Sequence, residues 1–310
     1  GRIVFVGDEK QEAAMAEVKV GHRMILKSGL SSVIAAGVVT SIAKDYRGAD
    51  SKHWLRDFDG WDLPGYCTVQ WHRPLQPVPA TGFRPGTLYT TPQAALHELA
   101  EQIIATEAAL VPVSEPAPVI KLEIESIVDH LVREGLSIGA AEDLGATLRR
   151  IRRLANYYYT ELPWANTREH ETRTFLIVPL LLALGWSEQC IKIEEPAAGG
   201  RADIALFDRP YAKTGQSNCV AIIETKGFSQ GLDYAPEQVK RYGEHFPTCK
   251  TLFVSNGYCY KVYVRSLDGL FDVSKPSAYL NLLKPTDRYS LDPSVPGALD
   301  VLVLLMRGLQ

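Results

Sequence analysis

The chain has 310 residues, of which 46% are hydrophobic and 22% charged, so it is long enough for two domains and can bury a sizeable core. The formal net charge is −3, so the chain does not belong to the strongly basic class of nucleic-acid-binding proteins. Any contact with phosphate must come from local patches of Lys and Arg. No apolar run reaches the length of a membrane span, and the five cysteines show no zinc-ligand spacing, which together favour a cytoplasmic protein with reduced thiols and no membrane partner.

The first segment, residues 1–92, has a β-rich pattern. Strands are predicted over residues 22–27, 33–42 and 68–72. The loop between the second and third strands is rich in aromatic and acidic residues. Its notable members, with the tryptophan of the following strand, are Trp54, Asp59, Trp61, Asp62 and Trp71.

Four stretches of this segment, VGHRMILKSG, VIAAGVVTSIAKDYRG, DFDGWDL and VQW, resemble PUA-like β-barrels of the EVE and YTH type. The resemblance covers about residues 20–74 and implies a reader that accepts a flipped, modified base. Such a base needs a stacking face and hydrogen-bond partners for its edge. Trp54, Trp61 and Trp71 could supply the first, and Asp59 or Asp62 the second. The alternative is a small barrel whose tryptophans only fill the core.

The second segment, residues 93–165, is predicted to be a helical connector. Helices are expected over residues 93–110, 120–134 and 137–161, with a proline-rich linker at 111–119. The last of these helices carries four arginines between Arg149 and Arg153. They are a candidate phosphate contact, and the alternative is the solvated face of an amphipathic helix.

The third segment, residues 166–310, begins with a predicted helix that starts at Asn166 or Thr167 and ends near Gly185. Regular helical spacing puts Glu171 on one stripe with three apolar residues, Phe175, Val178 and Leu182. A carboxylate on an apolar stripe is costly unless a metal ion or a lysine pairs with it. The alternative is a frayed first turn with Glu171 in water.

Three predicted strands follow this helix, over residues 191–195, 202–207 and 220–225. Asp203 opens the second strand and Glu224 closes the third. Side chains alternate along a strand, so Glu224 and Lys226 share one face. Two carboxylates can hold a hard cation through oxygen, and a lysine beside them can orient water or neutralise phosphate charge. The alternative is a surface hairpin with ordinary charges.

A helix beginning at Pro236 is predicted next, with Gln238 and Tyr242 on one face. Two strands, over residues 251–254 and 258–264, complete the pattern around a Ser-Asn-Gly turn. The third segment therefore reads helix, three strands, helix and two strands.

This order, with the motifs ETRTFLIVPLLLALGW, GGRADIAL, IIETKG, EQVKRY and FVSNG, resembles the PD-(D/E)xK nuclease superfamily, and most closely the N-terminal nuclease domain of type I restriction-enzyme R subunits. The resemblance implies an α/β restriction-endonuclease-like core, a mixed sheet flanked by helices. It further implies that Asp203 and Glu224 ligate Mg²⁺ and that Lys226 assists the attacking water. Glu171 matches the helix acid of the family, and Gln238 matches the glutamine of the later helix.

The expected activity is Mg²⁺-dependent hydrolysis of double-stranded DNA by a modification-dependent restriction endonuclease, whose N-terminal barrel reads a modified cytosine. One active site cuts one strand, so a double-strand break suggests a homodimer. Two alternatives stay open: a non-catalytic or DNA-gripping subunit of a larger restriction complex, and a nuclease acting on modified RNA. The P-loop pattern GxxxxGK[ST] does not occur, so any motor must lie outside this sequence.

Overall fold

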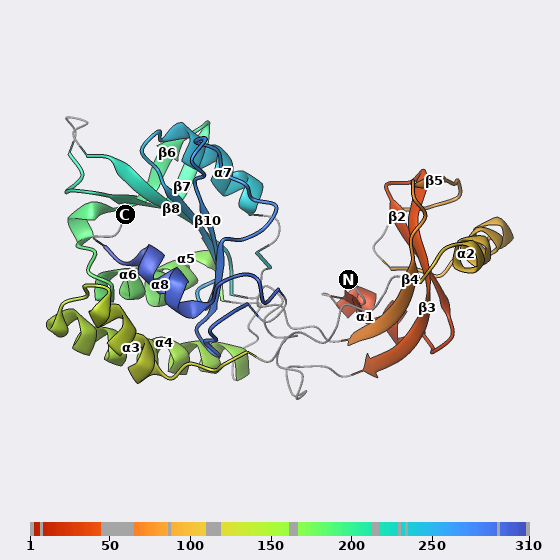
Figure 1. Cartoon of the computed structure of the whole chain (residues 1–310), viewed down its shortest axis with the longest axis horizontal. Coiled ribbons are helices and arrows are strands. Elements are labelled where there is room, and N and C mark those ends of the chain that lie inside the picture. Colours follow the sequence, from red (N-terminus) through yellow and green to blue (C-terminus); the bar gives the residue numbers. More distant parts are fainter. Residues whose placement is uncertain are drawn as a thin grey trace. The chain divides into compact units, whose positions relative to one another are not determined.

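A computed structural model describes residues 3–6, 9–44, 65–85, 88–109, 119–160, 167–212, 217–228, 231–232, 235–289 and 292–307. The described residues form two compact units, one ending at residue 109 and the other starting at residue 119 (Figure 1). The segment 93–165, expected as a connector, is divided between them, because its first helix belongs to the first unit and its other two belong to the second.

The first unit is an antiparallel sheet with helices. Its elements are β1 (Ile3–Val6), α1 (Glu9–Ala16), β2 (Arg23–Ser28), β3 (Ser32–Lys44), β4 (Gly65–His72), β5 (Val78–Pro79) and α2 (Ala94–Thr106). The strand order is β1-β4-β3-β2, and β5 pairs with β3. The three predicted strands and the first predicted helix are confirmed as β2, β3, β4 and α2. The described strands form an open sheet, so they do not by themselves close the expected barrel.

The first unit buries two small apolar clusters. One joins Met15 and Val18, at and after the end of α1, to Trp71 of β4. The other joins Ala100 and Ile103 of α2 to β3. The register of β3 shifts near its start, opposite Leu26 and Lys27. Such a bulge changes which residues face each side of a strand, and it allows β3 to contribute to both clusters.

The second unit contains a mixed sheet of six strands. Its elements are α3 (Ile124–Arg133), α4 (Ile138–Thr160), α5 (Glu169–Thr172), the π-helical turn η3 (Arg173–Ile177), α6 (Val178–Ala183), the short turn η4 (Glu188–Cys190), β6 (Ile191–Ala197), β7 (Gly200–Phe207), β8 (Cys219–Thr225), α7 (Pro236–His245), β9 (Thr251–Ser255), β10 (Cys259–Val264), β11 (Ala278–Asn281) and α8 (Ala298–Leu305). The sheet order is β11-β10-β9-β8-β7-β6, in which β8 and β9 are parallel and the other neighbours antiparallel.

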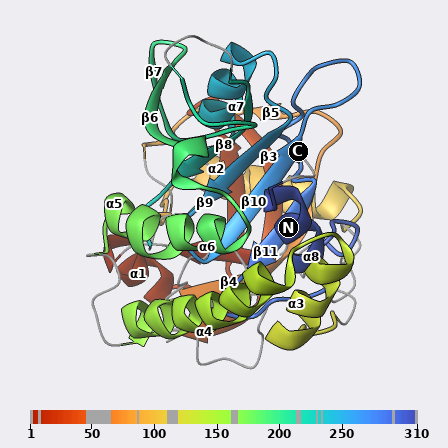
Figure 2. The same ribbon diagram turned by 90° about the vertical axis from the view of Figure 1, so that its left-hand side faces the viewer.

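This unit confirms the α/β class and the predicted order of elements through β10; β11 and α8 were not predicted. Figures 1 and 2 show α3, α4, α6 and α8 on one side of the sheet and α7 on the other. Every residue of β8 and β9 is buried, which explains why both strands read as continuous apolar runs. One large core fills both sides of the sheet, and it includes Leu144 and Ile151 of α4 and Val239 of α7.

The helix predicted over residues 166–185 is not one regular helix. It consists of α5, the π-helical turn η3 and α6, with Pro179 in the first turn of α6. Proline has no backbone N–H and disturbs the turn that precedes it, and a π turn is one way to accommodate this. The wider turn rotates the residues before it relative to those after it. Consequently the predicted apolar stripe is wrong, because Phe175 and Leu182 are exposed.

Candidate functional site

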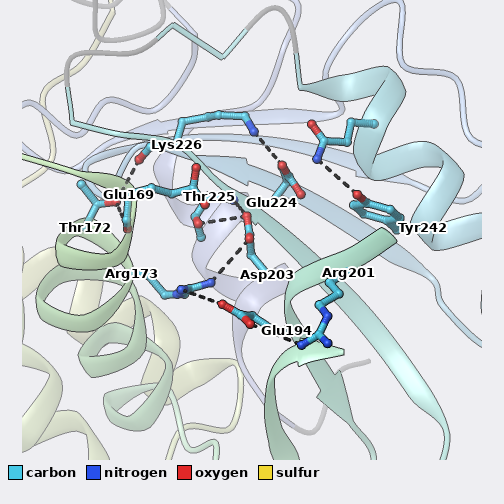
Figure 3. A network of polar contacts seen from close by, with 11 residues as sticks. Glu169, Thr172, Arg173, Glu194, Arg201, Asp203, Glu224, Thr225, Lys226 and Tyr242 are labelled. Carbon is cyan, nitrogen blue, oxygen red and sulfur yellow. Dashed lines mark hydrogen bonds and ion pairs between the residues drawn. The ribbon is translucent and has the colours of Figure 1, made fainter. Parts of the chain in front are cut away.

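The antiparallel pairing of β7 with β8 brings the two predicted carboxylates together. Ile204 lies opposite Ile223, and continuing this register by one residue places Asp203 opposite Glu224. Residues directly opposite each other in an antiparallel pair project from the same face of the sheet. Figure 3 shows Asp203 and Glu224 in one cluster of polar side chains, as the sequence predicted.

Glu224 is the most buried charged group of this cluster. Its side chain is 3% exposed, and its Oε1 lies 2.6 Å from Lys226 Nζ. Its Oε2 is buried and has no hydrogen-bond partner among the described residues. Burial, followed by the charge of Asp203, raises the pKa of Glu224 to about 7, although Lys226 acts in the opposite direction. A buried carboxylate with an unused oxygen is a suitable position for a cation.

Asp203 is held by the backbone at the end of β8. The Thr225 N–H donates to Asp203 Oδ2 at 2.6 Å, and the Thr225 hydroxyl donates to the same oxygen at 3.0 Å. The second oxygen, Oδ1, lies 3.5 Å from a guanidinium nitrogen of Arg173. The two Thr225 bonds fix the orientation of the carboxylate and leave Oδ1 as the oxygen that can change partner.

Lys226 follows the last residue of β8 and points to Glu224, as the period of a strand predicts (Figure 3). Its backbone N–H donates to the Ser255 carbonyl at 2.8 Å, which ties it to the end of β9. Its own carbonyl lies 2.8 Å from the Thr172 hydroxyl of α5. These backbone contacts keep the ammonium group beside the carboxylate pair.

The helix acid of the cluster is Glu169. Its pKa is raised by burial and then by the charge of Asp203, whereas Lys226 and a hydrogen bond with Thr225 act to lower it. Figure 3 shows Glu169 beside Thr225. The predicted acid, Glu171, instead accepts a hydrogen bond from the Arg168 N–H at 2.8 Å and so caps its own helix. The stripe that carries Glu171 assumes a regular helical period, but this period is broken by the π turn that begins at Arg173.

Gln238 lies on α7 and donates from Nε2 to the Tyr242 hydroxyl at 3.3 Å. The predicted spacing of these two residues on one helical face is therefore correct. Tyr242 in turn packs over the β6–β7 hairpin. A Cβ atom placed on Gly200 would come within 2.7 Å of the Tyr242 hydroxyl oxygen, so a larger residue there would force the Tyr242 side chain to shift.

An additional ionic network was not predicted from the sequence. Arg173 lies 3.5 Å from Asp203 and 3.6 Å from Glu194, and Arg201 lies 3.5 Å from the other oxygen of Glu194. The four residues of this chain of charges come from η3, β6 and β7. No local pattern in the sequence links such distant residues. For the helix acid a local signal does exist, because Glu169 lies in the same helix turn as Glu171.

The donors of this site fit a hard divalent cation. Asp203 and Glu224 supply carboxylate oxygens, which are the ligands that Mg²⁺ prefers, and Glu224 Oε2 is buried without a partner among the described residues. Across the residues that the structure describes, no group of three or more His, Cys, Asp or Glu side chains forms a metal-binding cluster. Asp203 and Glu224 would supply two carboxylates to a Mg²⁺ ion, and oxygens from water and substrate can complete such a coordination shell.

The predicted base pocket lies mostly outside the described residues, which exclude Trp54, Asp59, Trp61 and Asp62. Trp71 is described and is 7% exposed, packed within the apolar cluster of the first unit. In this arrangement Trp71 fills the core.

None of the described helices is both long and apolar enough to cross a lipid bilayer. Comparisons of the chain with protein-family models, with curated proteins and with solved structures found no match.

Proposed function

We propose that the second unit is a Mg²⁺-dependent nuclease that hydrolyses phosphodiester bonds in double-stranded DNA. The observation that carries this proposal is the cluster of Asp203, Glu224 and Lys226, in which two carboxylates from paired strands meet a lysine ammonium. Glu169 adds a third acid from the facing helix.

Each residue has a role in this proposal. Asp203 and Glu224 would hold Mg²⁺, which when bound stabilises the charge that develops on the phosphate during hydrolysis. Lys226 donates hydrogen bonds to the attacking water and orients it toward phosphorus. Glu169, whose pKa is raised, is placed to accept a proton from that water. The Thr225 N–H and hydroxyl fix Asp203 throughout.

The DNA backbone would also contact the exposed face of α4. Arg150 and Arg153 are exposed and form no ion pair with another described residue, whereas Arg149 pairs with Glu125 at 2.8 Å. The C-terminal end of α4 lies near the cluster, because the rings of Tyr158 and Phe228 are 5.5 Å apart and Phe228 follows Lys226 closely in sequence. Two exposed arginines on this helix would add positive charge for contact with a polyanionic substrate.

For the whole chain we propose a restriction endonuclease that depends on base modification. The first unit would be a PUA-like barrel that reads a flipped, modified cytosine. Two copies of the chain would cut the two strands. The support is the sequence resemblance, together with the antiparallel sheet of the first unit.

The experiment is digestion of matched plasmids, unmodified or carrying 5-methylcytosine or 5-hydroxymethylcytosine, with Mg²⁺ or with EDTA. The proposal expects cleavage that needs Mg²⁺ and is selective for one modified plasmid. Equal cleavage of all plasmids would retain the nuclease and reject the reader. Binding without cleavage would favour a DNA-gripping subunit. Cleavage of modified RNA alone would mean that the substrate is RNA rather than DNA.

A further inference from the structure

Two departures from regular backbone structure lie close to Asp203. The π-helical turn η3 begins at Arg173. Glu194, in the middle of β6, has a φ of 55°, in the left-handed region that residues other than glycine seldom adopt. The β6–β7 ladder pairs Ile193 with Ile204 and Glu195 with Ala202, so Glu194 and Asp203 lie between these two pairs. Strained backbone persists only where the surroundings hold it, and it gathers at functional sites.

The two irregular segments bring Arg173 between two carboxylates. One guanidinium nitrogen lies 3.5 Å from Asp203 Oδ1 and another lies 3.6 Å from Glu194 Oε1. Both distances exceed the roughly 2.7–2.9 Å of a close charge-assisted hydrogen bond. The Arg173 side chain is 14% exposed. A guanidinium has five N–H donors and keeps its charge, so Arg173 retains donors for a third anion.

Arg173 also occupies the one oxygen of Asp203 that can change partner. Oδ2 is bound twice by Thr225, and Oδ1 faces Arg173. A divalent cation that binds Oδ1 must therefore compete with the guanidinium. Glu194 gives Arg173 a second partner when Oδ1 is taken.

We propose that Arg173 binds the non-bridging oxygens of the scissile phosphate, and that Glu194 is the positioning residue that holds its guanidinium during the exchange from Asp203 to phosphate. The inference rests on the proposed nuclease function and deepens it. In the absence of substrate Arg173 neutralises Asp203 and weakens cation binding. In the presence of substrate and cation, it turns to the phosphate while Glu194 keeps it within reach.

The first test measures Mg²⁺ binding and DNA cleavage on the same variants. Arg173→Gln should bind Mg²⁺ several-fold more tightly than the wild type in calorimetry without DNA, because a competing charge is removed. The same variant should cleave DNA at least about 100-fold more slowly, the usual order for loss of a group that stabilises transition-state charge. A merely structural arginine would weaken both properties together, or neither.

Arg201→Gln is the matched control. Arg201 also pairs with Glu194, but its side chain is 66% exposed and its carboxylate partner is Glu194 rather than Asp203. Its replacement should leave Mg²⁺ affinity within about twofold of the wild type. An equal gain in Mg²⁺ affinity in both arginine variants would show a general charge effect and overturn the proposal.

The role of Glu194 is tested by a double-mutant cycle. Glu194→Gln should weaken Mg²⁺ binding in the wild-type background, because Arg173 then turns fully to Asp203. The same substitution should change Mg²⁺ binding less than about twofold in the Arg173→Gln background. Equal losses in both backgrounds would mean that Glu194 acts on the cation directly, and would remove its positioning role.

DNA binding separates failure of this inference from failure of the nuclease proposal. If the wild type cleaves nothing, the nuclease proposal fails, and duplex binding in Ca²⁺ still tests Arg173. Arg173→Gln should then lower the slope of log affinity against log salt by about one phosphate contact. An unchanged slope, or wild-type cleavage by Arg173→Gln, rejects Arg173 as the phosphate ligand. Thermal unfolding confirms that each variant is folded.

Discussion

Lys226 Nζ lies 2.6 Å from Glu224 Oε1, and this ion pair closes a strand in which every residue is buried. An ammonium group beside a buried carboxylate neutralises it when no metal ion is bound. The second Glu224 oxygen still has no hydrogen-bond partner among the described residues. The ion pair therefore offsets the cost of burying the Glu224 charge and leaves one carboxylate oxygen for a cation.

The pKa of Glu224 makes the stability of the protein depend on pH. Its folded value, about 7, lies above its ordinary value of 4.5. Between these values the folded protein binds more protons than the unfolded chain. The stabilisation that comes from protonated Glu224 is therefore full below about pH 4.5 and is lost as the pH rises through about 7. Glu224→Gln should therefore raise the free energy of unfolding by about 1–3 kcal/mol at pH 8 and by much less at pH 5.

Chemical unfolding at both pH values, without added metal, measures this difference. Glu171→Gln makes the same chemical change away from the carboxylate pair and is the matched control. A gain for Glu224→Gln that is equal at pH 5 and pH 8 would contradict the assignment.

Replacing Glu169 and Glu171 one at a time tests which of these two acids belongs to the site. Glu169→Gln should lower the cleavage rate by about 100-fold or more, because it removes the candidate proton acceptor. Glu171→Gln keeps a side-chain oxygen that can accept the Arg168 N–H, so it should cost little stability and leave the rate within a few-fold of wild type. Single-turnover cleavage compares the rates of the two variants, and thermal unfolding compares their stabilities. The reverse order of rates would assign the acid of the site to Glu171.

Trp71 and Trp61 should respond differently to truncation. Trp71→Ala removes a buried ring from the small core of the first unit and should destabilise that unit by about 3–5 kcal/mol. Trp61→Ala should weaken binding to modified DNA by about tenfold at an unchanged melting temperature, if it stacks on the flipped base. Melting curves and binding isotherms on the two variants separate core packing from base recognition. A large melting-temperature loss in Trp61→Ala would favour the core for this residue also.

The exposed arginines of α4 should contribute to affinity without contributing to sequence preference. Arg150→Gln with Arg153→Gln should reduce the slope of log affinity against log salt by about two and weaken binding equally for all DNA sequences. Arg149→Gln, which breaks a pair with Glu125, is the control and should change the slope less. An unchanged slope in the double variant would assign this face of α4 to solvent.

The sequence predicts the parts of the site that depend on a regular backbone. Apolar runs locate β7 and β8, and the period of a strand places Lys226 beside Glu224. The predicted stripe that carries Glu171 extends a regular helical period across the π turn at Arg173, and in the structure Glu169 rather than Glu171 lies in the polar cluster. The contacts of Arg173 depend on tertiary pairing and on the backbone of Glu194, for which no local signal exists.

Other parts of the fold lack a strong signal. The strand β11 has four residues and shows no alternation, since all four are buried. The barrel that the N-terminal resemblance implies would need contacts between distant strands, and period alone does not specify those contacts. The division of the helical segment between two units likewise follows from packing: Ile124 and Leu131 of α3 join the core of the second unit.

The most direct test of the central claim is cleavage of plasmid DNA by the wild type, Asp203→Ala and Lys226→Ala under single-turnover conditions with Mg²⁺. The wild type should cleave, and each variant should lose at least about 1,000-fold in rate while keeping its fold and its affinity for DNA within a few-fold. Cleavage at the wild-type rate by both variants would contradict the account and place the chemistry elsewhere in the chain.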